Sequence, residues 1–236
     1  MYTKIIKINS YDVDYKNNLK LSSLAKYFQQ VARENLDELG MTYNYLLEHN
    51  IVFVLSKYSI RIHNTISSDD NIILKTSPSE VKGVSFIRDF IVEDSDGSKL
   101  IEASSSWVII DFKNRTILRP NALPSTIPHS GKLVDFYPER TNVLEGDLID
   151  QRTVRYADLD SNGHLNNCIY LDIICDALYK TYKDIPAISS IEISYEHEAL
   201  ANDELEILFL NENNCFHIKC FNKTQEKNCF SALLRA

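Results

Sequence analysis

Two segments of the chain repeat apolar side chains with the spacing of an α-helix. In residues 22–39 the apolar positions recur at i, i+3, i+4, i+7 and i+8. Either Ser22 or Ser23 can cap the start of this helix, and Gly40 is placed to end it. A second helix is expected over residues 165–182, where apolar side chains surround much of the circumference. That distribution predicts a helix that is buried on most sides.

Each predicted helix is followed by segments rich in β-branched and aromatic residues, which is typical of strands. The first half is expected to hold strands over residues 51–63, 71–77, 84–93 and 99–111, with a hairpin turn at Asp96-Gly97. The second half is expected to hold strands over residues 187–197, 204–210, 215–221 and 228–234, with turns at Asn213-Asn214 and Asn222-Lys223. With a further strand before each helix, the chain reads as strand, long helix and about four strands, twice over.

The two halves align on each other without gaps inside the aligned blocks. The helix starts align with an offset of 144 residues, from Leu21 to Leu165, and the strands with an offset of 133, from Ser56 to Ser189. The difference is assigned to a longer loop in the first half, over residues 41–50. A long helix wrapped by an antiparallel sheet, present twice, is an α+β fold called the tandem, or double, hotdog.

A proline-containing segment, residues 119–140, lies between the two halves. Its composition reads as an extended linker rather than a helix or strand. We therefore expect two domains, residues 1–130, which end within the proline-containing linker, and residues 131–236.

The charge and composition of the chain narrow the classes of function. The formal net charge is −8, from 25 Lys and Arg against 33 Asp and Glu. This disfavours nucleic acid as the main partner, because phosphate binding needs a surplus of cations. The longest apolar runs are too short to span a bilayer, and residues 1–11 lack the apolar region of a signal peptide. We therefore expect a soluble, cytoplasmic protein that binds neither nucleic acid nor membranes.

The cysteines do not have the spacing of zinc ligands, because they include no Cys-x-x-Cys pair and no nearby paired histidines. The five are Cys168, Cys175, Cys215, Cys220 and Cys229. We expect reduced, mostly buried thiols, no metal site and no cofactor.

The polar stretch before the second helix is the strongest candidate for a functional site. Residues 155–170 read Arg-Tyr-Ala-Asp-Leu-Asp-Ser-Asn-Gly-His-Leu-Asn-Asn-Cys-Ile-Tyr, with Asp, Asn and His side chains crowded ahead of a buried helix. Such residues serve either as helix caps or as a site. Asn162 or Asn166 could be an N-cap, and a single histidine is usually structural, so the local pattern alone leaves both interpretations open.

Together with two other segments, this stretch resembles the acyl-ACP thioesterase family of plants and bacteria. Residues 158–167 are similar to the family's Asp-Leu-Asp-x-Asn-x-His-Val-Asn-Asn motif, with Leu165 in place of the valine. Residues 104–120 resemble its Trp-containing strand and Arg-Pro element, and residues 191–199 resemble its strand ending in Tyr-x-x-Glu-Cys. The resemblance runs over nearly the whole chain and includes a duplicated hotdog fold.

The resemblance implies catalytic roles for four residues, Asp160, Asn162, His164 and Glu198. Ala199 stands where the family has a cysteine, which excludes a thiol nucleophile there and favours attack by an activated water. We assign either Glu198 or His164 as the base, with the other orienting it. Asn162 can hold the water or polarise the carbonyl, and Asp160 would orient Asn162 or His164.

Three neighbours of these residues are expected to contact the substrate, namely Gly163, Asn166 and Asn167. Gly163 lets the substrate approach the backbone closely, and N–H groups at the start of the second helix favour developing negative charge. For Glu198 a structural alternative exists, because a regular strand would place it on one solvated face with Glu196 unless the strand ends or bulges first. The neighbouring His197 is taken as structural.

The repeat predicts that only the second half is catalytic. At their offsets, Asp160, Asn162, His164 and Glu198 align with Lys16, Asn18, Lys20 and Thr65. The first half would therefore lack both carboxylates and the imidazole. By the resemblance it houses the acyl chain, and Ala32 and Leu55 are expected to line that pocket.

The expected function is hydrolysis of fatty acyl-ACP thioesters to free fatty acid and carrier protein, which terminates fatty acid synthesis. An acyl-CoA thioesterase, a hotdog dehydratase and a non-catalytic acyl-binding module are the alternatives. Four cations near the second helix are candidates for docking the carrier protein, unless they are simply a solvated face: Arg152, Arg155, Lys180 and Lys183. The oligomeric state stays open, with a homodimer as one candidate.

Overall fold

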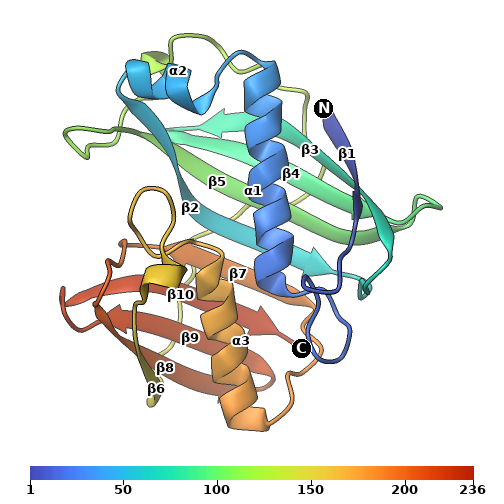
Figure 1. Ribbon diagram of the computed structural model, residues 1–236, viewed down its shortest axis with the longest axis vertical. Coiled ribbons are helices and arrows are strands. Elements are labelled where there is room, and N and C mark those ends of the chain that lie inside the picture. Colours follow the sequence, from blue (N-terminus) through green and yellow to red (C-terminus); the bar gives the residue numbers. More distant parts are fainter. The chain divides into compact units, whose positions relative to one another are not determined.

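The structure is a computed structural model that describes residues 1–236. The chain divides into two compact units, unit 1 (Met1–Pro138) and unit 2 (Glu139–Ala236). Each unit holds one long helix and five antiparallel strands (Figure 1). No helix of the structure is long and apolar enough to cross a lipid bilayer.

Unit 1 pairs its strands in the order β1-β3-β4-β5-β2. Its elements are β1 (Tyr2–Lys7), α1 (Leu21–Glu38), α2 (Tyr43–Glu48), β2 (Ile51–Ile62), β3 (Asn71–Lys82), β4 (Ser85–Glu93), β5 (Lys99–Asp111) and the short 3-10 helix η1 (Pro120–Ala122). The long helix α1 lies across one face of the sheet (Figure 1). Phe28 of α1 stacks on Phe90 of β4 with ring centroids 4.5 Å apart, so the apolar face of the helix and the sheet together form the core.

Unit 2 pairs its strands in the order β7-β10-β9-β8-β6. Its elements are β6 (Asp147–Thr153), the 3-10 helix η2 (Tyr156–Asp158), α3 (Ile169–Tyr182), β7 (Ser190–Tyr195), β8 (Glu204–Glu212), β9 (Cys215–Asn222) and β10 (Lys227–Arg235). Tyr170 of α3 packs edge-on against Phe230 of β10, with ring centroids 5.1 Å apart. The helix again buries its apolar side chains against the sheet, as its pattern predicts.

The first predicted helix is confirmed within one residue at each end, but its cap is not. Ser22 and Ser23 lie inside α1 and are buried, and the residue at the N-cap position, Lys20, makes no side-chain capping bond. Gly40 follows the helix with φ +75° and donates its N–H to the carbonyl of Asp37. A glycine adopts this backbone conformation without steric cost, so it ends the helix as predicted.

The second helix begins four residues later than predicted, at Ile169 rather than residue 165. Leu165 instead forms an isolated antiparallel bridge with Leu159. Neither of the two candidate caps, Asn162 and Asn166, occupies the N-cap position, which is held by Cys168 with no side-chain bond. Leu165 is buried all the same, which is why its hydrophobic position matched the helical pattern.

The loop expected over residues 41–50 contains the short helix α2. Thr42 caps this helix, since its Oγ1 accepts the N–H of Tyr45 at 3.2 Å. The tight turn at Asn213 and Asn214 is confirmed, with φ values of 54° and 61°. The turn predicted at Asn222-Lys223 lies one residue later, because Asn222 still belongs to β9.

Candidate active site

The loop that precedes α3 is folded around the carboxylate of Asp160. Oδ1 of Asp160 accepts the backbone N–H groups of Asn162 at 2.8 Å and His164 at 3.3 Å. The backbone of the loop closes through Asp160 N–H to the His164 carbonyl at 2.8 Å and through Gly163 N–H to the Asp160 carbonyl at 3.1 Å. Gly163 has φ +79°, a conformation that most residues adopt only with strain.

Glu198 does not lie on a strand face, because β7 ends at Tyr195. The carbonyl of Cys229, at a register shift of β10, accepts the next two N–H groups, from Glu196 at 2.8 Å and His197 at 3.4 Å. The chain thereby leaves the sheet before Glu198. The solvated-strand alternative is therefore wrong, and the condition under which Glu198 could join the site is met.

Backbone contacts bring the segment after β7 against the loop. The N–H of Leu165 donates to the carbonyl of Ala199 at 2.8 Å, and His164 forms an antiparallel bridge with Leu200. As a result, Nδ1 of His164 lies 3.3 Å from Oε2 of Glu198. Neither residue could be placed beside the other from its own strand or helix pattern.

The His164–Glu198 pair is accessible to solvent, with 20% of the histidine side chain and 47% of the glutamate side chain exposed. A carboxylate beside Nδ1 holds the imidazole ring and favours a proton on that nitrogen. Nε2 is then the basic nitrogen of the ring. The arrangement has the geometry of a general base and the group that orients it.

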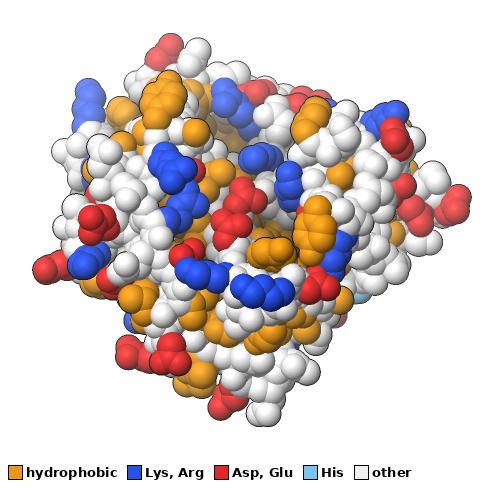
Figure 2. All heavy atoms as spheres, turned by 60° about the horizontal axis from the view of Figure 1, so that its bottom comes forward, with side chains coloured by type: hydrophobic (Ala, Val, Ile, Leu, Met, Phe, Trp, Pro, Cys, Tyr) orange, Lys and Arg blue, Asp and Glu red, His pale blue; other side chains and the backbone are white.

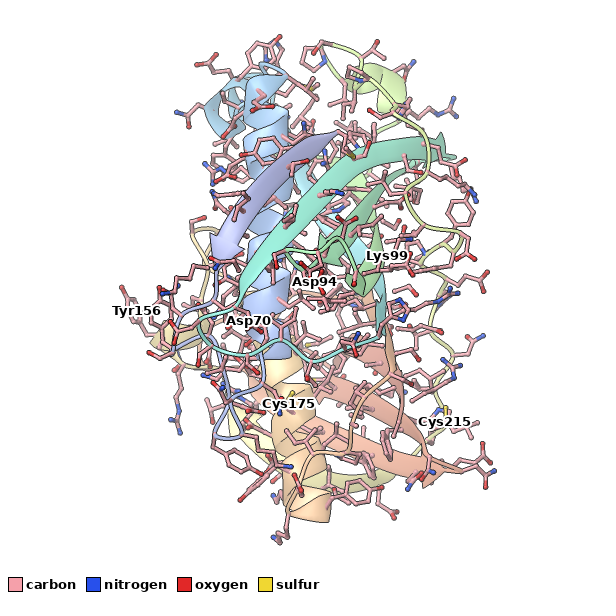
Figure 3. The ribbon with its side chains drawn as sticks, turned by 90° about the vertical axis from the view of Figure 1, so that its right-hand side faces the viewer. Asp70, Asp94, Lys99, Tyr156, Cys175 and Cys215 are labelled. Atoms are coloured by element: carbon pink, nitrogen blue, oxygen red, sulfur yellow. The ribbon has the colours of Figure 1, made fainter.

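The other two candidate residues form a second pair. Nδ2 of Asn162 donates to Oδ2 of Asp160 at 3.4 Å, in addition to the backbone bonds described above. The structure thus brings the four candidates together as two pairs whose members are joined by direct contacts. Beside the loop, Tyr156 of η2 projects away from the ribbon and is 91% exposed (Figure 3).

Asn166 and Asn167 both take part in the entry to α3. Oδ1 of Asn166 accepts the N–H of Cys168 at 2.9 Å, and the carbonyl of Asn167 accepts the Tyr195 hydroxyl at 3.3 Å. A Cβ added to Gly163 would meet no atom within 4 Å. Space next to Gly163 is therefore open, while its positive φ is the feature that requires glycine.

Unit 1 contains the same loop. Asp14 Oδ1 accepts the N–H groups of Lys16 at 2.8 Å and Asn18 at 3.0 Å, and Asp14 N–H donates to the Asn18 carbonyl at 2.8 Å. Asn17 has φ +66°, like Gly163, and Leu19 N–H donates to the Ile66 carbonyl at 2.7 Å, like Leu165 to Ala199. The carbonyl of Leu100 accepts the N–H groups of His63 and Asn64, as that of Cys229 does in unit 2.

These bonds correct the alignment of the repeat. The loop residues correspond with an offset of 146, from Asp14 to Asp160, and not 144. Asp14, Lys16, Asn18 and Thr65 therefore match Asp160, Asn162, His164 and Glu198, whereas Lys20 matches none of them. The prediction that the first half lacks both carboxylates is wrong, because Asp14 keeps one of them. Its carboxylate builds the loop, and the residues that distinguish unit 2 are Asn162, His164 and Glu198.

The residues expected to line an acyl pocket are both buried in unit 1. Ala32 on α1 is 6% exposed and Leu55 on β2 is 2% exposed. An open pocket of about 490 Å³ does occur in unit 1, but its lining is different: Gly83, Val84, Arg119, Pro120 and Asn121. Ala32 and Leu55 are therefore buried positions outside that pocket, and their contact with an acyl chain stays a prediction.

Two of the four proposed docking cations are neutralised within unit 2. Nη2 of Arg152 lies 2.5 Å from Asp158, and Nζ of Lys180 lies 2.6 Å from Asp150. Arg155 and Lys183 are exposed. On the face shown in Figure 2, basic and acidic side chains are intermingled.

No three His, Cys, Asp or Glu side chains are grouped so that they could hold a metal ion. All five cysteines are free thiols, and Cys168, Cys220 and Cys229 are buried. A hydrogen bond with Cys220 lowers the pKa of the Cys229 thiol, while the same bond raises that of Cys220. Both thiols are buried in unit 2, and only the backbone carbonyl of Cys229 contributes to the site.

Comparison with known proteins assigns the chain to a family of hydrolytic enzymes. The family model of the acyl-ACP thioesterase N-terminal domain matches residues 1–121, and that of the C-terminal domain matches residues 142–232. The chain belongs to the acyl-ACP thioesterase family.

Its relatives include plant enzymes of low identity. The chain is 20% identical over 225 residues to the acyl-[acyl-carrier-protein] hydrolase FATB3 of Cuphea viscosissima, which covers 87% of this chain and 53% of the relative. It is 20% identical to the palmitoyl-acyl carrier protein thioesterase of Arabidopsis thaliana, over 88% of this chain and 54% of the relative. The chain thus spans about half the length of these curated relatives.

Solved structures share the fold. An acyl-ACP thioesterase from Bacteroides thetaiotaomicron has a TM-score of 0.86 at 22% identity, covering 99% of this chain and 96% of the other. The 12:0-ACP thioesterase of Umbellularia californica has a TM-score of 0.80 at 16% identity, with coverage of 99% and 96%.

Proposed function

We propose that this protein hydrolyses fatty acyl thioesters carried on acyl carrier protein and releases the free fatty acid. The observation that carries the proposal is the close approach of His164 and Glu198 beside the Asp160–Asn162 loop. Membership of the acyl-ACP thioesterase family supports the choice of substrate.

Attack by water is the chemistry that these side chains suit. Nε2 of His164 would take a proton from the water as its oxygen bonds to the thioester carbon, and Glu198 would stabilise the imidazolium that forms. The C–S bond then breaks, and the imidazolium returns the proton to the departing thiolate. A carboxylic acid and the carrier-bound thiol are the products. Ala199 offers no nucleophile of its own.

Asn162 has the donor that the reaction also needs. Asp160 holds the loop that carries Asn162 and accepts one hydrogen of its amide. The amide can then orient the attacking water or donate to the carbonyl oxygen as negative charge develops there. In this scheme Gly163, Asn166 and Asn167 would shape the neighbouring substrate surface.

A tandem hotdog is the proposed architecture, with unit 1 as the acyl-chain domain and unit 2 as the catalytic domain. The recurrence of one loop in both units supports a duplicated origin. Unit 1 has Asn18 and Thr65 where unit 2 has His164 and Glu198, which supports a division of labour between the two.

For the carrier protein we propose docking through the exposed cations Arg155 and Lys183, with Arg152 and Lys180 as weaker contributors because they are already paired. Charge reversal at Arg155 and Lys183 should raise KM for acyl-ACP and leave KM for a small thioester unchanged. Equal increases in both KM values would rule out docking at these residues.

Release of free fatty acid from matched acyl-ACP and acyl-CoA substrates tests the proposed function. Wild-type protein should hydrolyse acyl-ACP with the higher kcat/KM, and His164→Ala should abolish the release. A preference for acyl-CoA would make the protein an acyl-CoA thioesterase instead. Acyl binding without hydrolysis would indicate a binding module.

A further inference from the structure

Asp203 is a buried carboxylate for which neither the family motif nor the proposed mechanism provides a role. It lies in the turn between β7 and β8 and is only 6% exposed. Its Oδ2 atom accepts three hydrogen bonds, from Leu200 N–H at 2.8 Å, Asn222 Nδ2 at 2.7 Å and Gln225 Nε2 at 2.6 Å. Hydrogen bonds to a carboxylate are strong ones, so this turn is tied firmly to the end of β9.

The same turn ends the segment that carries Glu198. Leu200, which donates to Asp203, is also the bridge partner of His164. Asp203 is itself held by its backbone, because its carbonyl accepts Val154 N–H at 2.9 Å and its N–H donates to the Leu200 carbonyl at 3.1 Å. The segment around Glu198 is thus fixed at its start by the Cys229 carbonyl and at its end by Asp203.

Unit 1 offers an internal comparison. Asp70 occupies the equivalent turn, directly before β3 (Figure 3), and its Oδ2 accepts Ser67 N–H at 2.8 Å. Its carbonyl accepts Ile8 N–H at 2.9 Å, as that of Asp203 accepts Val154 N–H. Asp70 is exposed, however, and no side-chain amide donates to it. The two added donors, Asn222 and Gln225, occur only in the unit that contains the His164–Glu198 pair.

We propose that Asp203 is a positioning residue for this pair. By holding Leu200 it fixes the strand-like contact with His164 and, two residues earlier, the place of Glu198. The carboxylate touches neither the substrate nor the imidazole, so it acts only through the backbone of the segment. Displacement of a catalytic group by about 1 Å can lower the rate on the order of 10²-fold. The hydrogen bonds of Asp203 would therefore sustain the rate by keeping Glu198 in place.

The inference rests on the proposed function, and matched variants of Asp203 and Asp70 test it. Asp203→Ala should lower kcat for acyl-ACP by at least about 10-fold, leave KM within about twofold and change the pH profile of kcat. Asp70→Ala removes the corresponding bond in unit 1 and should lower the melting temperature while leaving kcat within about twofold. A crystal structure of Asp203→Ala should show the Nδ1–Oε2 separation of His164 and Glu198 widened from 3.3 Å.

A milder variant covers the case in which Asp203→Ala does not fold. Gln225→Ala removes one of the three donors and keeps the carboxylate, and it should lower kcat by a few-fold without a change in KM. Exchanging the groups, Asp203→Asn with Asn222→Asp, should restore part of the activity that Asp203→Asn alone loses.

Two results would overturn the inference. The first is a folded variant, Asp203→Ala or Gln225→Ala, that keeps the wild-type kcat and pH profile. The second is a crystal structure of such a variant in which His164 and Glu198 keep their separation. A wild-type protein that hydrolyses no acyl thioester would instead contradict the proposed function, and the crystal structure would still test the role of Asp203.

Discussion

Nδ1 of His164 lies 3.3 Å from Oε2 of Glu198, although 34 residues of chain separate the two. The contact depends on an α-helix, a strand and a backbone carbonyl that stops that strand before Glu198. It joins two residue types that work together as base and orienting group.

Replacing either member of the pair should remove most of the activity. His164→Ala is expected to lower kcat by about 10²–10⁴-fold, the usual contribution of a general base. Glu198→Gln keeps the size of the side chain but not its charge, and should lower kcat by about 10-fold or more while leaving KM unchanged. Steady-state hydrolysis of acyl-ACP measures both, with His197→Ala as a control that should stay within twofold. A Glu198→Gln variant as active as wild type would show that the carboxylate has no role.

Replacing Asp160 or Asp14 by alanine should lower the stability of the protein by similar amounts, but only the Asp160 variant should lose activity. Each carboxylate accepts two backbone N–H groups of its loop, so Asp→Ala at either position should cost about 1–3 kcal/mol of unfolding free energy. Only Asp160→Ala should also lower kcat, because only its loop carries Asn162 and His164. Chemical denaturation and hydrolysis assays on both variants test this. Loss of activity in a well-folded Asp14→Ala protein would contradict it.

Gly163 should tolerate asparagine better than alanine. Alanine at φ +79° is strained by about 1–2 kcal/mol, whereas asparagine already occupies the equivalent position of unit 1 with φ 66°. Thermal unfolding should therefore rank wild type first, Gly163→Asn second and Gly163→Ala last. The reverse order of the two variants would mean that the side chain, not the backbone, limits this position.

Larger side chains in the core of unit 1 should shorten the preferred acyl chain. Ala32→Phe and Leu55→Trp place larger side chains between α1 and the sheet, where both residues are buried and where the resemblance predicts the acyl chain. Free fatty acids released by cells that express each variant can be analysed by chain length. Val54→Phe, at a neighbouring position that is 38% exposed, serves as the control. An unchanged chain-length profile in both core variants would argue against an acyl pocket at this place.

The regular elements could be predicted because burial leaves a periodic trace in the sequence. The predicted bounds of β2, β4, β5, β10 and α1 agree with the structure within a residue or two. The start of α3 was misplaced because Leu165 is buried by a bridge rather than by a helix, and the two kinds of burial look alike. The six residues of α2 were missed because so short a helix carries too few apolar positions to show a period.

The site could be predicted only in part. The motif and the family resemblance named the side chains, but the end of β7 depends on the Cys229 carbonyl, and a backbone acceptor leaves no mark on the sequence. The apolar pattern pairs Leu21 with Leu165 and so places Lys20 over His164. The backbone hydrogen bonds instead pair Leu19 with Leu165 and Asp14 with Asp160, so both halves keep the aspartate.

The two units share the backbone hydrogen bonds of this loop but differ in the side chains that it carries. Unit 1 retains every backbone bond of the loop and the aspartate that organises it, yet has Lys16, Asn18 and Thr65 at the three positions that differ in chemistry. Lys16→Asn, Asn18→His and Thr65→Glu would place the candidate catalytic side chains of unit 2 at the equivalent positions of unit 1. The two units therefore share the hydrogen-bonded loop, and the difference in their proposed chemistry rests on three side chains.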